Sequence, residues 1–207
     1  MKHLLISFVL GGSLVAGDVS VLPRDHAKET WVRATLARLG LNNDIRVVRD
    51  DALGSNNICA YAIIQAGRQY IAYDPGCVTT LTPGEPNYVW SAGVILHEIA
   101  HHLGAHTATY GKPTFAEEIE AERWTGWAFR HEGFTLEQAI AYAREGQGEA
   151  SSTRPGPADR VRAVEAGWRS GGALKAGRQE SAPAGANVER LADAARRHLK
   201  TLRKDNP

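Results

Sequence analysis

Two histidines and one glutamate lie close together in the segment GVILHEIAHHLGAHT, residues 93–107. The order His97-Glu98-x-x-His101 places the two imidazoles four residues apart, so both project from the same face of a helix. Such a pair can bind one metal ion, and this spacing is typical of zinc sites. Zinc lowers the pKa of a water molecule that it binds to about 7, and an adjacent carboxylate can then accept the proton of that water. The segment therefore predicts a zinc site with Glu98 as a general base.

A catalytic zinc ion needs a third protein ligand, and the segment TFAEEIEAERWTGWAFR, residues 114–130, offers carboxylates for this role. Glu118 and Glu122 are four residues apart and share a helix face. One can bind the metal while the other contacts a metal-bound histidine. Glu117 and Glu120 point in other directions, so we expect water to surround them. The alternative is an ordinary solvated acidic helix face.

Two more histidines follow the pair. His102 is turned by about 100° from His101 on a helix, so it should miss the metal. His106 comes after Gly104, beyond the expected end of the helix. We expect both to lie at the surface or in a loop and neither to be a ligand.

The segments HEIAHH and EIEAERWTGWAFR together resemble the zinc metallopeptidases of the HtpX and CAAX-prenyl-protease family, which are gluzincins. The pattern of that family is H-E-x-x-H, followed by E-x-x-x-D on the next helix. The resemblance implies zinc ligands His97, His101 and Glu118, with Glu98 as the general base of peptide hydrolysis. Glu122 stands where the family has aspartate, and the resemblance implies that it holds a ligand histidine.

A second motif of the family, H-P-x-x-x-x-R, is similar to RPGPADR at residues 154–160. The proline and the last arginine match, whereas Arg154 replaces the histidine. The resemblance implies that Arg160 lies near the zinc and stabilises the oxyanion or positions the substrate. Solvation of a helix end is the alternative for both arginines. The likeness also includes NICAYAIIQAGRQYIAYDPGCV, and in all it covers about residues 57–168.

The elements that must position these side chains follow from apolar spacing and turn signals. A buried stripe with alternating spacings of three and four predicts a helix over 88–103, capped by Asn87 and ended by Gly104; the stripe is Val89, Ala92, Leu96, Ile99 and Leu103. Further helices are predicted over 25–39, over 114–131, after a Thr135–Gln138 capping box, and over 158–168. A strand is predicted over 45–49, and a hairpin follows it with a turn at residues 66–67. We therefore expect an α+β fold: a mostly helical zincin-like metallopeptidase domain with a small antiparallel sheet and a C-terminal helix.

The first 17 residues, MKHLLISFVLGGSLVAG, have a basic start, a short apolar run and small residues at the end. This pattern predicts a signal peptide that is cleaved near Gly17 in a periplasmic or secreted protein, with an uncleaved anchor as the alternative. An exported chain meets an oxidising compartment. Cys59 and Cys77 flank the predicted hairpin, whose ends lie close together, so we expect a disulfide between them; two free buried thiols are the alternative.

The 207 residues divide into four predicted parts. These are a signal peptide over 1–17, a metallopeptidase domain over 18–170, a polar linker over 171–186 and an amphipathic helix over 187–207. That last helix could dock on the domain or bind a partner protein. A net charge of +1 argues against nucleic acid as a partner, and the mature form should have no stable membrane span.

The expected activity is that of an exported zinc endopeptidase acting on peptides or proteins. An extended peptide substrate could add to the sheet edge near residues 59–62. The main alternative is a catalytically weak or inactive zinc-binding module that acts through protein–protein interaction. A weaker alternative is an iron or manganese oxygenase, which also uses two histidines and a carboxylate but needs no glutamate directly after the first histidine.

Overall fold

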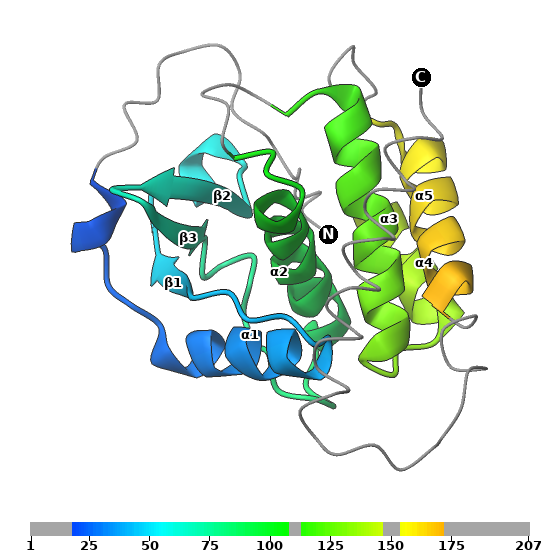
Figure 1. The fold of residues 1–207 in the computed structure, drawn as a ribbon, viewed down its shortest axis with the longest axis horizontal. Helices are drawn as coiled ribbons and strands as arrows, with labels where there is room; N and C mark the ends of the chain where they lie inside the picture. The colour runs from blue at the N-terminus through cyan, green and yellow to red at the C-terminus, as the bar shows by residue number, and fades with distance from the viewer. Residues whose placement is uncertain (1–17, 108–112, 147–153, 172–207) are drawn as a thin grey trace.

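The computed structural model describes residues 18–107, 113–146 and 154–171 of the chain (Figure 1). Within these residues, five α-helices and three β-strands confirm the expected α+β class. In chain order they are α1 His26–Arg38, β1 Ile45–Arg49, β2 Ala60–Gln65, β3 Arg68–Tyr73, α2 Tyr88–Leu103, α3 Phe115–His131, α4 Leu136–Glu145 and α5 Pro157–Gly171, with two short 3-10 helices, η1 Val19–Val21 and η2 Gly54–Asn56. The predicted signal peptide and the helix predicted over 187–207 lie outside the described residues.

The sheet is mixed, which corrects the expectation of an antiparallel sheet. Its strand order is β1-β3-β2. β2 and β3 form the predicted antiparallel hairpin, and both residues of its turn, Ala66 and Gly67, have positive φ. β1 instead pairs in parallel with β3, with Ile45 opposite Gln69. A tight turn makes its two strands antiparallel, but the chain between β1 and β2 is long enough to let β1 join the far side of β3 in the same direction.

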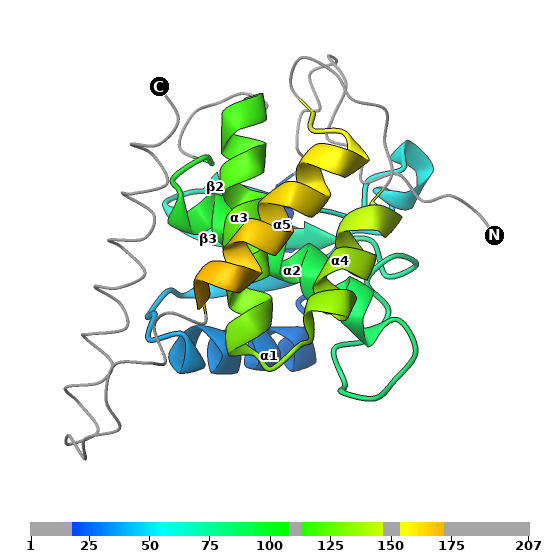
Figure 2. The same ribbon diagram turned by 90° about the vertical axis from the view of Figure 1, so that its right-hand side faces the viewer.

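The molecule has the sheet on one side, α2 in the centre and the other late helices beyond it (Figure 1). α2 packs on β2 and β3 with one face and on α3 with another, so most of its surface is buried. Figure 2 views the helical side and shows α5 crossing α3, with α4 beside them. The catalytic candidates on α2 therefore sit between a sheet and a helical layer.

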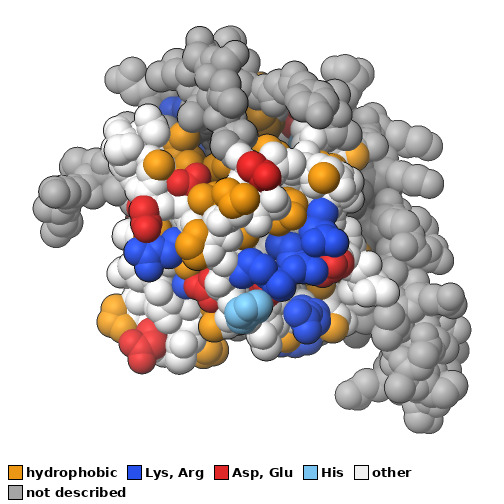
Figure 3. Space-filling view, turned by 90° about the vertical axis from the view of Figure 1, so that its left-hand side faces the viewer, with side chains coloured by type: hydrophobic (Ala, Val, Ile, Leu, Met, Phe, Trp, Pro, Cys, Tyr) orange, Lys and Arg blue, Asp and Glu red, His pale blue; other side chains and the backbone are white. Residues whose placement is uncertain are grey.

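A smaller core lies on the face of the sheet that points away from α2. Alternate residues of a strand point to opposite faces, so the sheet can bury side chains on both sides. The second core consists of Val19, Val48, Leu53, Ile58, Tyr70 and Ala72. Figure 3 shows the side of the molecule on which η1 lies, where apolar side chains are exposed next to Lys and Arg side chains. Val21 of η1 is 76% exposed.

Two glycines allow α3 and α5 to cross with their backbones close together. A Cβ atom on Gly126 would collide with the carbonyl group of Val164, and one on Gly167 would collide with the carbonyl group of Arg123. The close crossing places the start of α5, with Arg160, beside Glu122 in the middle of α3.

The helix starts agree in part with the predicted caps. Thr135 forms the predicted capping box with Gln138. Thr114 forms a second capping box with Glu117, which was not predicted. Asn87 precedes α2 as predicted, but its side chain makes no capping hydrogen bond because its backbone has a φ of 66°. α2 therefore begins from a backbone turn rather than a side-chain cap.

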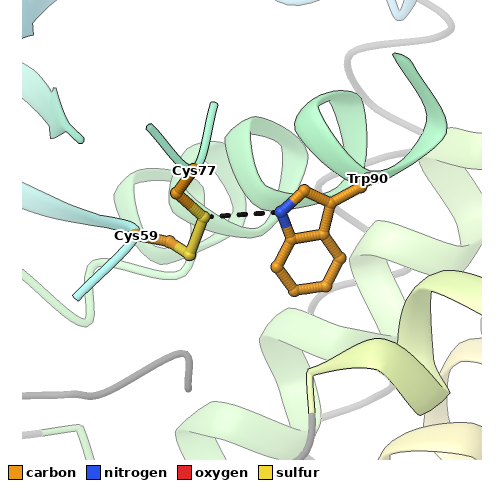
Figure 4. The surroundings of a disulfide bond; sticks show 3 residues. All are labelled: Cys59, Cys77 and Trp90. Carbon is orange, nitrogen blue, oxygen red and sulfur yellow. Dashed lines mark hydrogen bonds between the residues drawn. A yellow bond between two sulfur atoms is a disulfide. The ribbon is translucent and has the colours of Figure 1, made fainter. Parts of the chain in front are cut away.

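The predicted disulfide joins Cys59 to Cys77, whose Cα atoms are 5.3 Å apart. Figure 4 shows the indole Nε1 of Trp90 donating a hydrogen bond of 3.4 Å to Cys77 Sγ. The disulfide therefore links the start of β2 to the loop that precedes α2. Among the helices of the described residues, none combines the length and apolar composition needed to span a bilayer.

Candidate metal centre

His97, His101 and Glu118 come together as a buried group that could hold a metal ion. The Nε2 atoms of the two histidines are 3.1 Å apart. Oε2 of Glu118 lies 3.3 Å from His97 Nε2, and its Oε1 lies 3.8 Å from His101 Nε2. Ligand atoms placed about 2.1 Å from one tetrahedral ion are about 3.4 Å from each other. The three predicted ligands thus have the donor types and the spacing that a closely bound ion requires.

Local structure explains why these side chains meet. His97 and His101 are one helical turn apart on α2 and face α3. The capping box at Thr114 begins α3 just ahead of Glu118, which places this carboxylate in the first turn of the helix. Its negative charge there is favoured by the partial positive charge of a helix N-terminus.

Glu98 is next to this group and is 1% exposed. The backbone N–H of Ala62 on β2 donates a hydrogen bond to its carboxylate. Its Oε2 atom has no hydrogen-bond partner within the described residues. Burial raises the pKa of Glu98 to about 7, against the opposing effect of His97. A carboxylate with this pKa can both accept and release a proton near neutral pH.

Opposing influences act on the two histidines when no ion is bound. Burial lowers the pKa of His97, but the carboxylates of Glu122 and Glu118 outweigh it and raise the pKa to about 9. Burial and the neighbouring imidazoles of His97 and His106 push the pKa of His101 well below its usual value. Burial also raises the pKa of Glu118. The carboxylates thus favour a positive charge at His97, in the place where a cation would bind.

Glu122 lies next to Nδ1 of His97, on the side of the ring away from Glu118, and forms an ion pair with Arg160. Oε1 of Glu122 is 3.6 Å from Nδ1 of His97 and accepts a 2.6 Å hydrogen bond from Nε of Arg160. Nη1 of Arg160 donates to the carbonyl oxygen of Gly146, and its Nη2 has no hydrogen-bond partner in the described part of the chain. Burial opposes the charge of Arg160, but Glu122 outweighs that effect and raises the pKa of the guanidinium. Arg160 therefore stays charged at 5% exposure.

A small pocket opens beside these residues. It is lined by His97, Glu118, Glu122, Gly146, Arg154, Pro155 and Arg160. The RPGPADR segment is therefore brought next to the metal group, as its resemblance to the family motif implies. Both arginines line the pocket, and Arg160 is buried.

The structure corrects the expected positions of His102, His106 and Glu120. Both histidines are buried, at 5% and 4% exposure. His102 Nε2 is 2.9 Å from the carbonyl oxygen of Tyr70, which holds the ring against the sheet. His106 follows α2 in a turn, as expected, but folds back so that its Nδ1 lies 3.0 Å from Nδ1 of His101. Glu120 is 13% exposed rather than surrounded by water and lies 3.6 Å from His106 Nε2.

Tyr142 on α4 belongs to the surroundings of the site, and sequence reasoning missed it. Its ring packs where a Cβ on Gly93 would collide with it, and the guanidinium carbon of Arg160 lies 5.3 Å from the ring centre. Burial and the charge of Glu122 raise the pKa of its hydroxyl well above the usual value. Nothing in the local pattern of α4 separates Tyr142 from an ordinary core residue.

Comparison with models of protein families, with curated proteins and with solved structures gives no significant match. Two imidazoles and a carboxylate can hold a cation, a second carboxylate beside them can transfer a proton, and a buried guanidinium lies at the adjacent pocket.

Proposed function

We propose that this chain is a zinc-dependent endopeptidase of the gluzincin type, similar to the HtpX and CAAX-prenyl-protease family. One observation carries the proposal. The nitrogen and oxygen atoms of His97, His101 and Glu118 converge within 4.8 Å, and the buried carboxylate of Glu98 stands directly beside them. Two neutral imidazoles and one carboxylate form a typical ligand set of catalytic zinc. A zinc ion held there would polarise a carbonyl group and lower the pKa of a water molecule.

Glu98 supplies the proton transfer. Its Oε2, which has no hydrogen-bond partner among the described residues, is available to accept a proton from the attacking water, and the same carboxyl group can pass that proton to the leaving amine. The hydrogen bond from Ala62 holds the other side of the carboxylate in place. In the metal-free protein, burial raises the pKa of Glu98 to about 7, so this carboxyl group holds a proton more readily than an ordinary glutamate.

Glu122 and Arg160 support the site in different ways. Glu122 beside Nδ1 of His97 favours the tautomer whose Nε2 lone pair points toward Glu118. The ion pair with Arg160 restrains Glu122 in turn. Nη2 of Arg160, which has no partner among the described residues, is our candidate donor to the developing oxyanion.

The free edge of β2 is the proposed place for an extended peptide. Among the described strands β2 pairs only with β3. Asp74 donates to the carbonyl oxygen of Cys59, whereas the N–H of Ala62 points away from β3 toward Glu98. The direction alternates along a strand, so the backbone groups of Ala60 and Ile64 also point to the free edge. A substrate strand bound there would run past the general base.

Casein cleavage by the full chain tests the proposal, with bound zinc measured on the same samples. Glu98→Gln should retain zinc and lose nearly all turnover, because the amide cannot accept a proton. Glu85→Gln, which changes an exposed loop carboxylate in the same way, should cleave at the wild-type rate. Zinc in every sample without cleavage in any would instead favour the non-catalytic zinc module.

A further inference from the structure

A third imidazole, that of His106, contacts the ring of the candidate ligand His101 at Nδ1. Nδ1 of His106 is 3.0 Å from Nδ1 of His101, and the two rings meet edge to face with centroids 5.2 Å apart. Nε2 of His106 is then 3.6 Å from Oε2 of Glu120 on α3. His97 Nε2 and Glu118 approach His101 at its other nitrogen, Nε2. His106 therefore lies outside the ligand group and contacts His101 on the opposite side of the ring, at Nδ1.

The contact between His101 and His106 has one donor and one acceptor, and metal binding decides which ring is which. Two ring nitrogens at 3.0 Å share one hydrogen, so one donates and the other accepts. If Nε2 of His101 uses its lone pair for a metal ion, Nδ1 of that neutral ring carries the hydrogen and donates it. Nδ1 of His106 must then accept, which leaves the hydrogen of His106 on Nε2, facing the carboxylate of Glu120.

We propose that His106 is a positioning residue for the metal ligand His101, fixing its ring orientation and tautomer, with Glu120 orienting His106 in turn. This inference rests on the metal site of the proposed function. The two candidate ligands then have different partners at Nδ1. His97 faces the carboxylate of Glu122. His101 contacts the imidazole of His106, which in turn faces the carboxylate of Glu120. Hydrogen-bonded partners of this kind are worth about 10–100-fold in metal affinity.

The turn after α2 is shaped for this return. The backbone N–H of His106 donates to the carbonyl oxygen of His101 at 3.0 Å, and Ala105 between them has a φ of 58°. A Cβ on Gly104 would collide with the imidazole of His106. Glycine at this position therefore leaves the space that the ring of His106 occupies.

A matched pair of variants tests the role. In His106→Asn, the side-chain oxygen can stand close to the lost Nδ1 and accept the same hydrogen. His106→Leu has nearly the same shape as the asparagine but no acceptor. We expect zinc affinity, measured by competition with a chelator, to stay within about threefold of wild type in His106→Asn and to fall about 10–100-fold in His106→Leu. The absorption spectrum of the Co²⁺ form should be unchanged in His106→Asn.

The controls separate the possible failures. Unfolding of the metal-free variants in denaturant shows whether His106→Leu destabilises the fold. If His106→Leu does not fold, Glu120→Leu is compared with Glu120→Gln. Of these two, only Glu120→Leu should weaken zinc binding. Equal losses for asparagine and leucine, or no loss for either, would overturn the positioning role. A Co²⁺ spectrum altered by asparagine would make His106 a ligand and also overturn it. Absence of zinc binding by the wild type would instead refute the proposed metal site.

Discussion

The backbone N–H of Ala62 in the edge strand donates a hydrogen bond to the carboxylate of Glu98 in the central helix. The two residues are far apart in sequence, and α2 packs on β2 to bring them together. The bond links the proposed peptide-binding edge to the proposed general base. A displacement of β2 along the helix would therefore change both the substrate position and the orientation of the base.

The raised pKa of Glu98 predicts a pH-dependent stability difference in the metal-free protein. Its pKa is about 7 in the folded chain against 4.5 for an ordinary glutamate, so the folded state binds the proton more tightly. The stabilisation is complete below pH 4.5 and is lost as the pH rises through 7. Glu98→Gln stays neutral, so by pH 8 it should be more stable than wild type by up to about 3 kcal/mol, with no such gain at pH 4. Urea unfolding across this range, with Glu85→Gln as control, measures the difference; parallel curves for wild type and Glu98→Gln would contradict it.

Zinc binding should depend on pH through His97. Its pKa of about 9 means that a proton must leave before Nε2 can bind the ion below that pH. We expect the zinc affinity to rise about tenfold per pH unit from pH 6.5 and to level off above 9. Chelator competition across this range measures the slope.

The matched variant for that measurement is Glu122→Gln. The charge of Glu122 contributes most to the raised pKa of His97, so the curve of the variant should level off at a lower pH. An unchanged levelling point would show that Glu122 does not set the protonation of His97.

Breaking the Glu122–Arg160 pair should be costly. Arg160 is 5% exposed, so Glu122→Leu leaves a buried guanidinium without its carboxylate and should lower the free energy of unfolding by about 3–5 kcal/mol. The double variant Glu122→Leu/Arg160→Met removes both charges and should recover a large part of this loss. Denaturant unfolding of the metal-free wild type, the two single variants and the double variant gives the free energies of this double-mutant cycle. If the losses of the single variants simply add up in the double variant, Glu122 and Arg160 are not coupled.

The crossing of α3 and α5 predicts an unusual response to alanine. Alanine normally stabilises a helix relative to glycine by about 1 kcal/mol. Gly167→Ala should instead destabilise the protein by about 1–3 kcal/mol or more, because its Cβ would collide with the carbonyl group of Arg123. The neighbouring exposed Ala166→Gly is the control and should cost only the ordinary propensity difference. Thermal unfolding compares the two, and a stabilised Gly167→Ala would refute the tight crossing.

The parts of the site that depend on short-range spacing were predictable from the sequence. His97 and His101 share a face because four residues make about one helical turn, and the same holds for Glu118 and Glu122. The capping box of Thr135 and Gln138 is likewise local, and the structure contains it. The box of Thr114 and Glu117 has the same spacing but was not predicted. Asn87 shows the limit: it occupies the predicted N-cap position, but its backbone has a φ of 66° and its side chain makes no capping hydrogen bond.

The parts that depend on tertiary contacts were not predictable. The direction of β1 is decided by which edge of the hairpin it joins, and its own residues do not record that choice. The burial of His106 depends on the positive φ of Ala105 and on the space above Gly104. Tyr142 reaches the site only because α4 packs against α2. These residues carry no distinguishing pattern in the linear sequence.

The bond between Cys59 and Cys77 also has a consequence for metal selection. As free thiolates, two sulfur atoms near the start of α2 would be strong, soft ligands for zinc or copper and would compete with the imidazoles downstream. Once oxidised to each other, they no longer offer a thiolate. Among the described residues, the buried donor group that remains consists of nitrogen and oxygen atoms, which are harder ligands than thiolates.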